Sequence, residues 1–278
     1  MIELAASAEI SESYFNECMR APGQPLILRG GAAHWPCASL WTFAYFEELY
    51  GGEPLPVMDC LRRPTQVVET TVREYLTYCQ RPEGTKLHEL AVKHKLAAPF
   101  YAYGCRPFDV HPELKAHFQL PAYAHDWCQD MPLEMRQNFY PYGQVWLLFS
   151  GVGARSVLHR DDGSTIAWFA QLRGHKNFIV HPKSEGPMMY DGLVDPTRPD
   201  LTRFPDYAKS KPVKFTIHPG DLLYLPPDWY HYVRTESPSI TLTGNLVNQV
   251  NLGDYLRWAF KEQLPRFLSL LPTPAQVT

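Results

Sequence analysis

Ser156-Val157-Leu158-His159-Arg160-Asp161 is a strand-like run that ends in a His-x-Asp pair. Side chains two residues apart in extended backbone project to the same side. The imidazole of His159 and the carboxylate of Asp161 can therefore bind one metal ion together. The pair alone is a weak signal, because a solvated histidine in a turn beside the acidic pair Asp161-Asp162 would give the same letters.

A third ligand is available downstream, in Leu225-Pro226-Pro227-Asp228-Trp229-Tyr230-His231, where a proline-rich turn leads into a new strand. Two histidines and one carboxylate on one face of a metal ion leave three positions open, as in non-haem Fe(II) oxygenases. The open positions admit a chelating cosubstrate and then O2. His231 alone is more often a partly buried core residue, so the metal site is predicted from the joint occurrence of the two segments.

The second half of the chain is rich in short strands. We expect strands at residues 144–149, 165–171, 177–181, 213–217, 221–225, 231–234 and 240–247. Turn signals such as Arg173-Gly174 and His218-Pro219-Gly220-Asp221 separate them. This spacing favours a sandwich or barrel over alternating βαβ units.

The first half is mixed, with helices expected at residues 8–20, from 39 to 51 and from 71 onward. Strands are expected at 25–30 and at 54–58, where two prolines confine the second one to a sheet edge. The last segment, residues 254–271, has apolar residues at helical spacing.

Composition narrows the class of protein. The chain has 278 residues, of which 45% are hydrophobic and 20% charged, enough for one large packed domain. A net charge of −3 gives no general reason to expect nucleic-acid binding. No segment has the roughly 20 apolar residues that span a bilayer, and the N-terminus does not resemble a signal peptide. The six cysteines form no CxxC pair, which argues against a cysteine zinc site and predicts free thiols in a cytoplasmic protein.

Several segments also carry a family resemblance. Residues 156–161, followed by Ala170-Gln171-Leu172-Arg173-Gly174-His175-Lys176, resemble the Jumonji-C pattern [ST]-x-x-H-x-D and A-Q-[VIL]-x-G-x-K. The segments 219–226 and 229–231 resemble P-G-[DE]-x-L-[FY]-[IL]-P and W-[WY]-H, and 25–30 resembles the family's first strand. The chain is thus similar, over about residues 20 to 250, to cupin-like Jumonji-C oxygenases. Within the family it most resembles small protein hydroxylases, both the arginyl-hydroxylase branch and the asparaginyl hydroxylase of hypoxia-inducible factor.

The resemblance implies a mainly β fold with α, a double-stranded β-helix (jelly-roll or cupin barrel) with N-terminal helical elements and a C-terminal helix. We expect a mixed N-terminal portion at 1–120 integrated with the barrel, the barrel core at 121–252, and a C-terminal helix and tail at 253–278. Relatives dimerise through such a helix, so a homodimer is a further expectation.

The resemblance also implies that the metal is Fe(II), held by His159, Asp161 and His231, and that 2-oxoglutarate and O2 are cosubstrates. The residues expected to hold 2-oxoglutarate are Lys176, which would pair with its distal carboxylate, and Ser156, Tyr101, Asn245 and Thr165. Substrate contacts are expected from Asp162, Trp168 and Asp228, and the carboxylates of the two aspartates could recruit a cationic side chain. The loop after Asp161 is about two residues longer than in the most similar relatives, and the asparagine that they often carry there is absent.

The function expected is hydroxylation of a C–H bond, in a protein or peptide side chain, with succinate and CO2 as coproducts. Two alternatives remain open: a hydroxylase of a small molecule or free amino acid, and a non-enzymatic cupin that binds a metal or ligand. The retention of all three metal ligands and Lys176 argues against the last. A nucleic-acid substrate is disfavoured, and no membrane association is expected.

Overall fold

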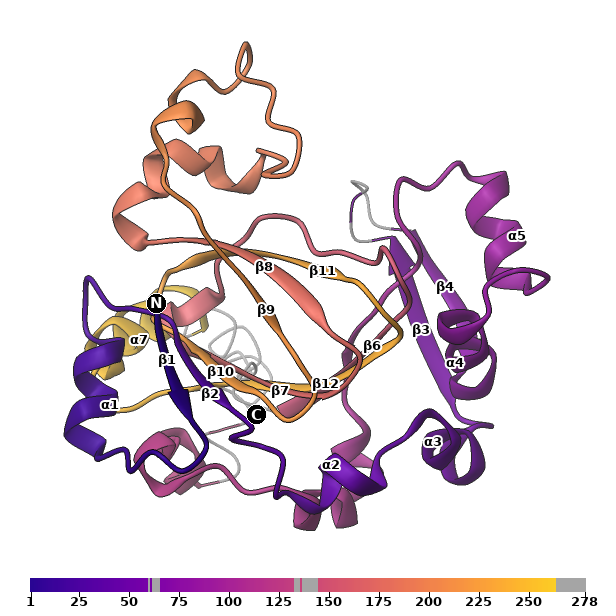
Figure 1. Cartoon of the computed structure of the whole chain (residues 1–278), viewed down its shortest axis with the longest axis horizontal. Helices are drawn as coiled ribbons and strands as arrows, with labels where there is room; N and C mark the ends of the chain where they lie inside the picture. The colour runs from indigo at the N-terminus through magenta and orange to yellow at the C-terminus, as the bar shows by residue number, and fades with distance from the viewer. Residues whose placement is uncertain (60, 62–65, 133–135, 137–144, 264–278) are drawn as a thin grey trace, which may run out of the picture.

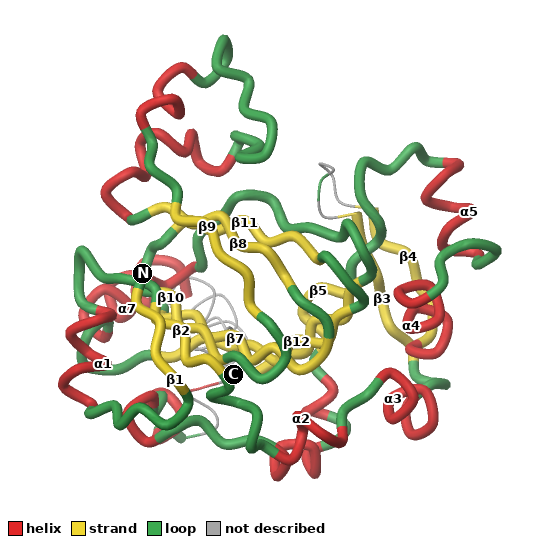
Figure 2. Tube along the Cα trace, in the orientation of Figure 1, coloured by secondary structure: helices red, strands yellow, loops and turns green. Residues whose placement is uncertain are grey.

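The computed structural model describes the chain except for residues 60, 62–65, 133–135, 137–144 and 264–278, and its centre is two facing β-sheets (Figures 1 and 2). The major sheet has the strand order β1-β2-β10-β7-β12-β6-β5, and the minor sheet has the order β11-β8-β9. In the major sheet these strands are β1 (Ile2–Ala5), β2 (Leu26–Arg29), β10 (Leu222–Leu225), β7 (Ile166–Arg173), β12 (Ser239–Leu246), β6 (Val145–Ser150) and β5 (Ala102–Cys105). The minor sheet consists of β11 (Tyr230–Thr235), β8 (Lys176–His181) and β9 (Val213–Ile217).

The two sheets enclose an apolar interior, as expected for a cupin barrel. Phe169 on β7 points inward and contacts Phe178 on β8, with ring centroids 5.3 Å apart. The neighbouring Trp168 points to the opposite face of β7, where it packs against Trp35 and Phe118. Because β7 is covered on both faces, its residues form an almost continuous hydrophobic run rather than an alternating one.

Helices and a small hairpin cover the outer face of the major sheet and its edges (Figure 1). The described helices are α1 (Glu12–Met19), α2 (Pro36–Leu40), α3 (Phe43–Tyr50), α4 (Val72–Gln80), α5 (Lys86–Lys93) and α7 (Leu252–Trp258), and a π-helical turn, η8 (Ala259–Gln263), follows α7. The hairpin pairs β3 (Pro54–Asp59) with β4 (Gln66–Thr71). None of these helices is long and apolar enough to cross a bilayer.

Short 3-10 turns make up most of the long connections. Four of them, η1 (Pro107–Asp109), η2 (Pro112–His117), η3 (Ala122–Ala124) and η4 (Trp127–Asp130), lie between β5 and β6. η5 (Asp162–Ser164) follows the His-x-Asp pair, and η6 (Lys183–Gly192) and η7 (Pro205–Lys209) form the lobe between β8 and β9 at the top of Figure 1.

Most expected elements are confirmed, with one change in the first half. The helix expected from 39 to 51 is two helices, α2 and α3, because Thr42 has extended backbone and caps α3 by accepting a hydrogen bond from the Tyr45 amide. β1, β2 and β5 come from the first 120 residues and are strands of the major sheet. The described part of the expected C-terminal helix is α7 with η8, and residues 264–271 lie outside the described residues.

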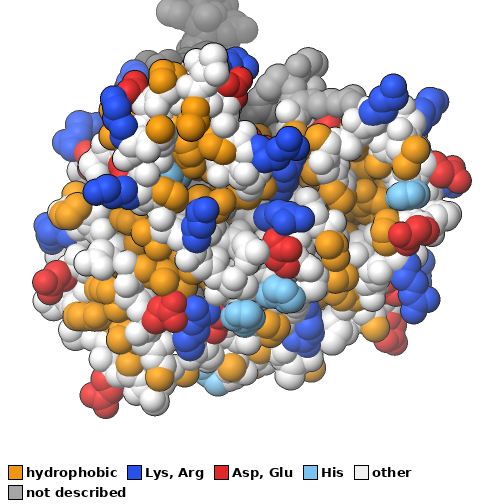
Figure 3. All heavy atoms as spheres, turned by 45° about the horizontal axis from the view of Figure 1, so that its top comes forward, with side chains coloured by type: hydrophobic (Ala, Val, Ile, Leu, Met, Phe, Trp, Pro, Cys, Tyr) orange, Lys and Arg blue, Asp and Glu red, His pale blue; other side chains and the backbone are white. Residues whose placement is uncertain are grey.

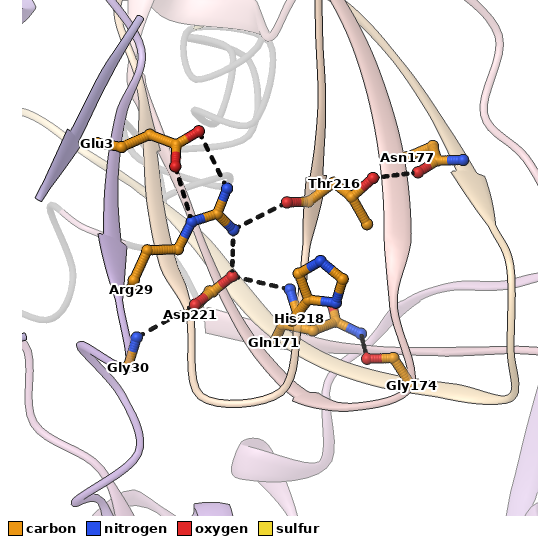
Figure 4. Close-up of polar contacts among 9 residues, drawn as sticks. All are labelled: Glu3, Arg29, Gly30, Gln171, Gly174, Asn177, Thr216, His218 and Asp221. Atoms are coloured by element: carbon orange, nitrogen blue, oxygen red, sulfur yellow. Dashed lines mark hydrogen bonds and ion pairs between the residues drawn. The ribbon is translucent and has the colours of Figure 1, made fainter. Parts of the chain in front are cut away.

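An ion pair joins two of the segments that carry the family resemblance (Figure 4). The Arg29 guanidinium, at the end of β2, donates to Asp221 Oδ2 at 2.6 Å and to the Thr216 carbonyl at 2.9 Å. The Asp221 carboxylate also accepts hydrogen bonds from the Gly30 and His218 amides. The R-G and P-G-D segments therefore fasten the N-terminal strands to the barrel.

Replacing Asp221 with asparagine is expected to lower the free energy of unfolding by about 2–4 kcal/mol, because the buried acceptor of Arg29 and two backbone amides loses its charge. Glu3→Gln removes a second carboxylate from the same Arg29, but Glu3 is 41% exposed, so the expected loss is only about 0–1 kcal/mol. Urea denaturation of the two variants measures the difference. Equal losses would contradict the structural role given to Asp221.

Candidate metal and cosubstrate site

His159, Asp161 and His231 form the one cluster of potential metal ligands found among the described residues, with their ligand atoms all within 4.8 Å of one another. Asp161 Oδ1 lies 3.8 Å from His159 Nε2 and 3.7 Å from His231 Nε2. One ion between these three atoms would have two imidazole ligands and one carboxylate ligand. The sequence analysis predicted that these three residues share one site, and in the structure their ligand atoms lie close together.

The two histidines are held as a pair by the backbone. His159 and His231 exchange two backbone hydrogen bonds, of 3.1 and 2.7 Å, so the segment before Asp161 pairs with β11. Each Nδ1 lies within hydrogen-bond distance of a backbone carbonyl, that of Val157 at 2.8 Å and that of Trp229 at 3.2 Å. Donation from Nδ1 leaves the Nε2 lone pair of each ring free to bind a metal. Burial lowers the pKa of His231, which keeps this ring neutral as a ligand must be.

Asp161 is oriented from the major sheet. The side-chain amide of Asn245, at the end of β12, donates to Asp161 Oδ2 at 2.8 Å and to Thr165 Oγ1 at 2.6 Å. The other oxygen, Oδ1, is the one that faces the two histidines. Asn245 and Thr165 were expected to contact 2-oxoglutarate, and the structure places both beside the carboxylate ligand.

The loop after Asp161 is fixed from two sides. On one side α7 covers it: Tyr255 and Trp258 lie so close to Gly163 that a Cβ there would be 3.1–3.2 Å from their rings. Gly163 also has a φ of 73°, which favours glycine. On the other side, Ser164 Oγ donates to the Asp228 carboxylate. Sequence reasoning missed this support by α7; the Gly163-Ser164 pair was its only signal.

Lys176 lies at the start of β8 with its side chain in the interior, 1% exposed. Within the described part of the chain, its amine makes one hydrogen bond, 3.3 Å, to the Tyr101 hydroxyl, and it lies 5.5 Å from the centre of the same ring. Burial lowers the pKa of Lys176 to about 7. Since an ammonium has three donors, a carboxylate entering the barrel would find a cation with unused hydrogen-bonding capacity.

Ser156 lies on the segment that pairs with β11, and β11 in turn pairs with β8, which carries Lys176. Its Oγ accepts a hydrogen bond from the Val233 amide at 3.1 Å. The hydroxyl proton is therefore available for a second partner. Ser156 thus occupies the wall of the interior between the histidine pair and Lys176.

The three residues expected to contact substrate have different surroundings. Asp228 is buried and already accepts from Arg160, Lys183 and Ser164, so its charge is balanced within the chain. Trp168 is a core residue on the outer face of β7 and does not point toward the histidines. Asp162 is exposed at the start of η5. Of these three, only Asp162 has an accessible carboxylate near the metal ligands.

The residues present fit the cofactors expected from the sequence. A set of two neutral imidazoles and one carboxylate, with the remaining side open, is a donor set for Fe(II). The buried Lys176 amine, which donates to the Tyr101 hydroxyl, suits the distal carboxylate of a dicarboxylate. Fold and site together define a cupin barrel with a candidate metal centre of two histidines and one carboxylate.

Comparison with known proteins gives the family. The model of the cupin-like domain family matches residues 11–246, so the chain belongs to this family. The oxygenases of the family use Fe(II), 2-oxoglutarate and O2. It is similar to Lysine-specific demethylase JMJ21 of Arabidopsis thaliana (26% identity, 83% of this chain, 24% of that protein). It is also similar to Lysine-specific demethylase 8 of Xenopus tropicalis (26%, 84% of this chain, 50% of that protein). A third relative is the human Bifunctional peptidase and (3S)-lysyl hydroxylase JMJD7 (22%, 80% of this chain, 76% of that protein). The chain thus spans a quarter to a half of the first two relatives.

The affinity for 2-oxoglutarate is expected to weaken as pH rises above about 7, because Lys176 must be protonated to pair with a carboxylate and its pKa in the free protein is about 7. Binding above this pH should take up a proton. Isothermal titration calorimetry in two buffers of different ionisation enthalpy measures the uptake. A binding enthalpy that does not depend on the buffer at pH 8 would contradict this role of Lys176.

Proposed function

We propose that this protein is an Fe(II)- and 2-oxoglutarate-dependent oxygenase that hydroxylates a C–H bond in a protein or peptide side chain. The observation that supports it most is the common interior shared by the metal-ligand cluster and the buried amine of Lys176. The overall reaction converts substrate C–H, 2-oxoglutarate and O2 into substrate C–OH, succinate and CO2. When bound, Fe(II) and 2-oxoglutarate supply the oxidising chemistry.

The chain's own residues bind and orient the reactants. His159, His231 and Asp161 hold the metal on one side and leave the other side open. Asn245 keeps one oxygen of Asp161 turned toward the histidines. Lys176 binds the distal carboxylate in the interior, and Tyr101 holds the Lys176 amine in place by its hydroxyl. The apolar barrel residues around Phe169 exclude water from this interior.

A polypeptide substrate is favoured by the relatives, two of which are named as lysine-specific demethylases and one as a lysyl hydroxylase. Figure 3 shows basic and acidic side chains interspersed on the face it presents, without the basic stripe typical of nucleic-acid binding. A small molecule or free amino acid is the second candidate substrate. A cytoplasmic location remains a prediction.

The proposal is tested by incubating the Fe(II)-loaded protein with 2-oxoglutarate, O2 and peptide pools, and measuring succinate and product mass. Succinate together with the mass of one added oxygen on a peptide supports protein hydroxylation. Loss of a methyl group from a methylated peptide would make the protein a demethylase, and oxidation of a free amino acid only would favour the second candidate. No succinate under any condition, while the metal and 2-oxoglutarate bind, would favour a non-enzymatic cupin.

We also propose that the protein forms a homodimer through its C-terminal helix. In α7, Tyr255 is buried against the chain's own loop, whereas Leu256 is 39% exposed and Phe260, in η8, is 62% exposed. Two exposed apolar side chains four residues apart on one helical face suit a partner surface. Size-exclusion chromatography with light scattering determines the mass, and a monomer at high concentration would refute the dimer.

A further inference from the structure

Asp228 is a buried carboxylate in the turn that leads into β11, and it lies outside the metal-ligand cluster found among the described residues. It is 5% exposed and has a φ of 61°, a left-handed conformation that glycine adopts more easily. A buried charge and a strained backbone both cost stability, and such positions concentrate at functional sites. The contacts of this carboxylate therefore indicate what the turn holds in place.

Both oxygens of the Asp228 carboxylate have partners from other segments. Oδ1 accepts from the Arg160 guanidinium at 3.1 Å, and Oδ2 pairs with the Lys183 ammonium at 2.6 Å. The Ser164 hydroxyl, which donates to the carboxylate, lies 3.1 Å from each oxygen. Ser164 is also left-handed, with a φ of 51°, so two residues in a strained conformation are hydrogen-bonded to each other.

Two of these contacts flank the carboxylate ligand Asp161 in the sequence. Arg160 directly precedes Asp161, and Ser164 lies three residues after it. Asp228 itself lies three residues before His231. The two histidine ligands are already joined by backbone hydrogen bonds. The Asp228 carboxylate adds a link between the backbone on both sides of Asp161 and the segment that carries His231.

The same carboxylate also holds the lobe between β8 and β9, at the top of Figure 1, through Lys183, the first residue of η6. At the other end of η6, Gly192 has a φ of 81°, and a Cβ there would collide with the carbonyl of Leu158, the residue before the first histidine ligand. Both ends of η6 are thus fastened to segments that carry metal ligands. Asp228 contacts this lobe and the loop after Asp161 at once.

We infer that Asp228 is a positioning residue for the metal centre, which holds Asp161 in place relative to His231 and binds neither the metal nor the substrate. The inference rests on the proposed function for the identity of the metal. It replaces the substrate contact that the sequence suggested for Asp228, because this carboxylate is buried and its charge is paired with Arg160 and Lys183. Without that charge, the loop that carries Asp161 would be held less firmly and the metal would bind more weakly.

The test compares Asp228→Asn with Asp221→Asn. Asparagine is close to aspartate in size and tolerates the left-handed conformation, so Asp228→Asn removes the charge with little change in shape. Asp221 is the matched control, since it is 4% exposed and also pairs with an arginine, Arg29. Asp221 directly precedes β10 and Asp228 follows it, so the two carboxylates lie at opposite ends of that strand.

Co(II) binding to the full chain is followed by visible absorption, and stability is measured by urea denaturation. We expect Asp228→Asn to weaken Co(II) binding by at least about tenfold and to change the absorption spectrum of the bound ion, because residues that support metal ligands typically contribute this much. Asp221→Asn should lose stability and keep the Co(II) affinity and spectrum of the parent protein. A folded Asp228→Asn protein with the parent's Co(II) affinity, or an equal loss of affinity in both variants, would overturn the inference.

Ser164→Ala keeps the inference testable if Asp228→Asn does not fold. It removes one hydrogen bond to the same carboxylate, and we expect Co(II) binding to weaken by about threefold or more. In the double variant the two losses should be less than additive, because both substitutions act through one contact. Parent-like affinity of Ser164→Ala, or full additivity, would contradict the inference. Co(II) binding needs no turnover, so a protein that forms no succinate but shows these effects would refute the proposed function alone.

Discussion

An Asp161→Ala variant is expected to lose Fe(II) binding by more than about 100-fold and to form no succinate. Asp161 supplies the only carboxylate of the three-ligand cluster, and its Oδ1 lies 3.7–3.8 Å from both histidine Nε2 atoms. Without it, two neutral imidazoles face a dication with no compensating charge. Loss of a residue that merely supports a ligand typically costs about 10–100-fold in metal affinity, so loss of the ligand itself should cost more.

The adjacent Asp162→Ala is the matched control, because Asp162 is exposed and belongs to no ligand cluster among the described residues. Titration with Co(II) or Mn(II), followed by calorimetry or visible absorption, compares the two variants with the parent protein. Equal metal affinity in all three proteins would refute the assignment of Asp161. A comparable loss in both variants would mean that the loop, rather than the ligand, had been damaged.

A Lys176→Met variant is expected to be more stable than the parent protein and unable to bind 2-oxoglutarate. The pKa of Lys176 falls from 10.5 to about 7 on burial, so the unfolded chain binds more protons between these values. Stability of the protein without cosubstrate therefore rises with pH across that window, and below it the buried charge costs on the order of several kcal/mol. Methionine has a similar length, fills the space and removes the charge.

The opposite effect on 2-oxoglutarate binding has the same cause. A dicarboxylate entering the variant would bury one carboxylate without its cation, and we expect a loss of at least about 100-fold in affinity. Lys214→Met is a control on the neighbouring strand β9, where the side chain is exposed. Thermal unfolding and calorimetry together test the prediction: a Lys176→Met protein that is less stable than the parent, or that still binds 2-oxoglutarate, would contradict it.

Much of the fold could be predicted from the sequence because the decisive signals are local. Strand-like runs ended by turn residues predicted β6 to β12 nearly in full. The His-x-Asp spacing predicted that the side chains of His159 and Asp161 project to the same side of the backbone, and the two residues do lie in one cluster. β1, β4 and α5 were missed. β4 has little apolar character beyond Val67 and Val68, and it is a strand because it pairs with β3.

The parts of the site that could not be predicted depend on distant contacts. Asp228 lies near the metal ligands, and only the structure reveals that Arg160 and Lys183 balance its charge. Trp168 neighbours a residue that faces the interior, yet strand alternation turns it toward the outer core. In both cases the side chain contacts residues from distant segments: Arg160 and Lys183 for Asp228, and Trp35 and Phe118 for Trp168. The residue spacing within one segment does not predict such contacts.

The three metal ligands are not held by the same number of contacts. His159 and His231 are tied to each other by two backbone hydrogen bonds, and each ring is tied to a carbonyl of its own segment. Asp161 depends on a loop and on one amide donated by Asn245. We therefore expect the histidine pair to keep its geometry without a metal ion. Asp161 should be the last of the three ligands to bind iron and the first to release it. The rate of iron exchange would then be governed by the loop and by the helix packed over it.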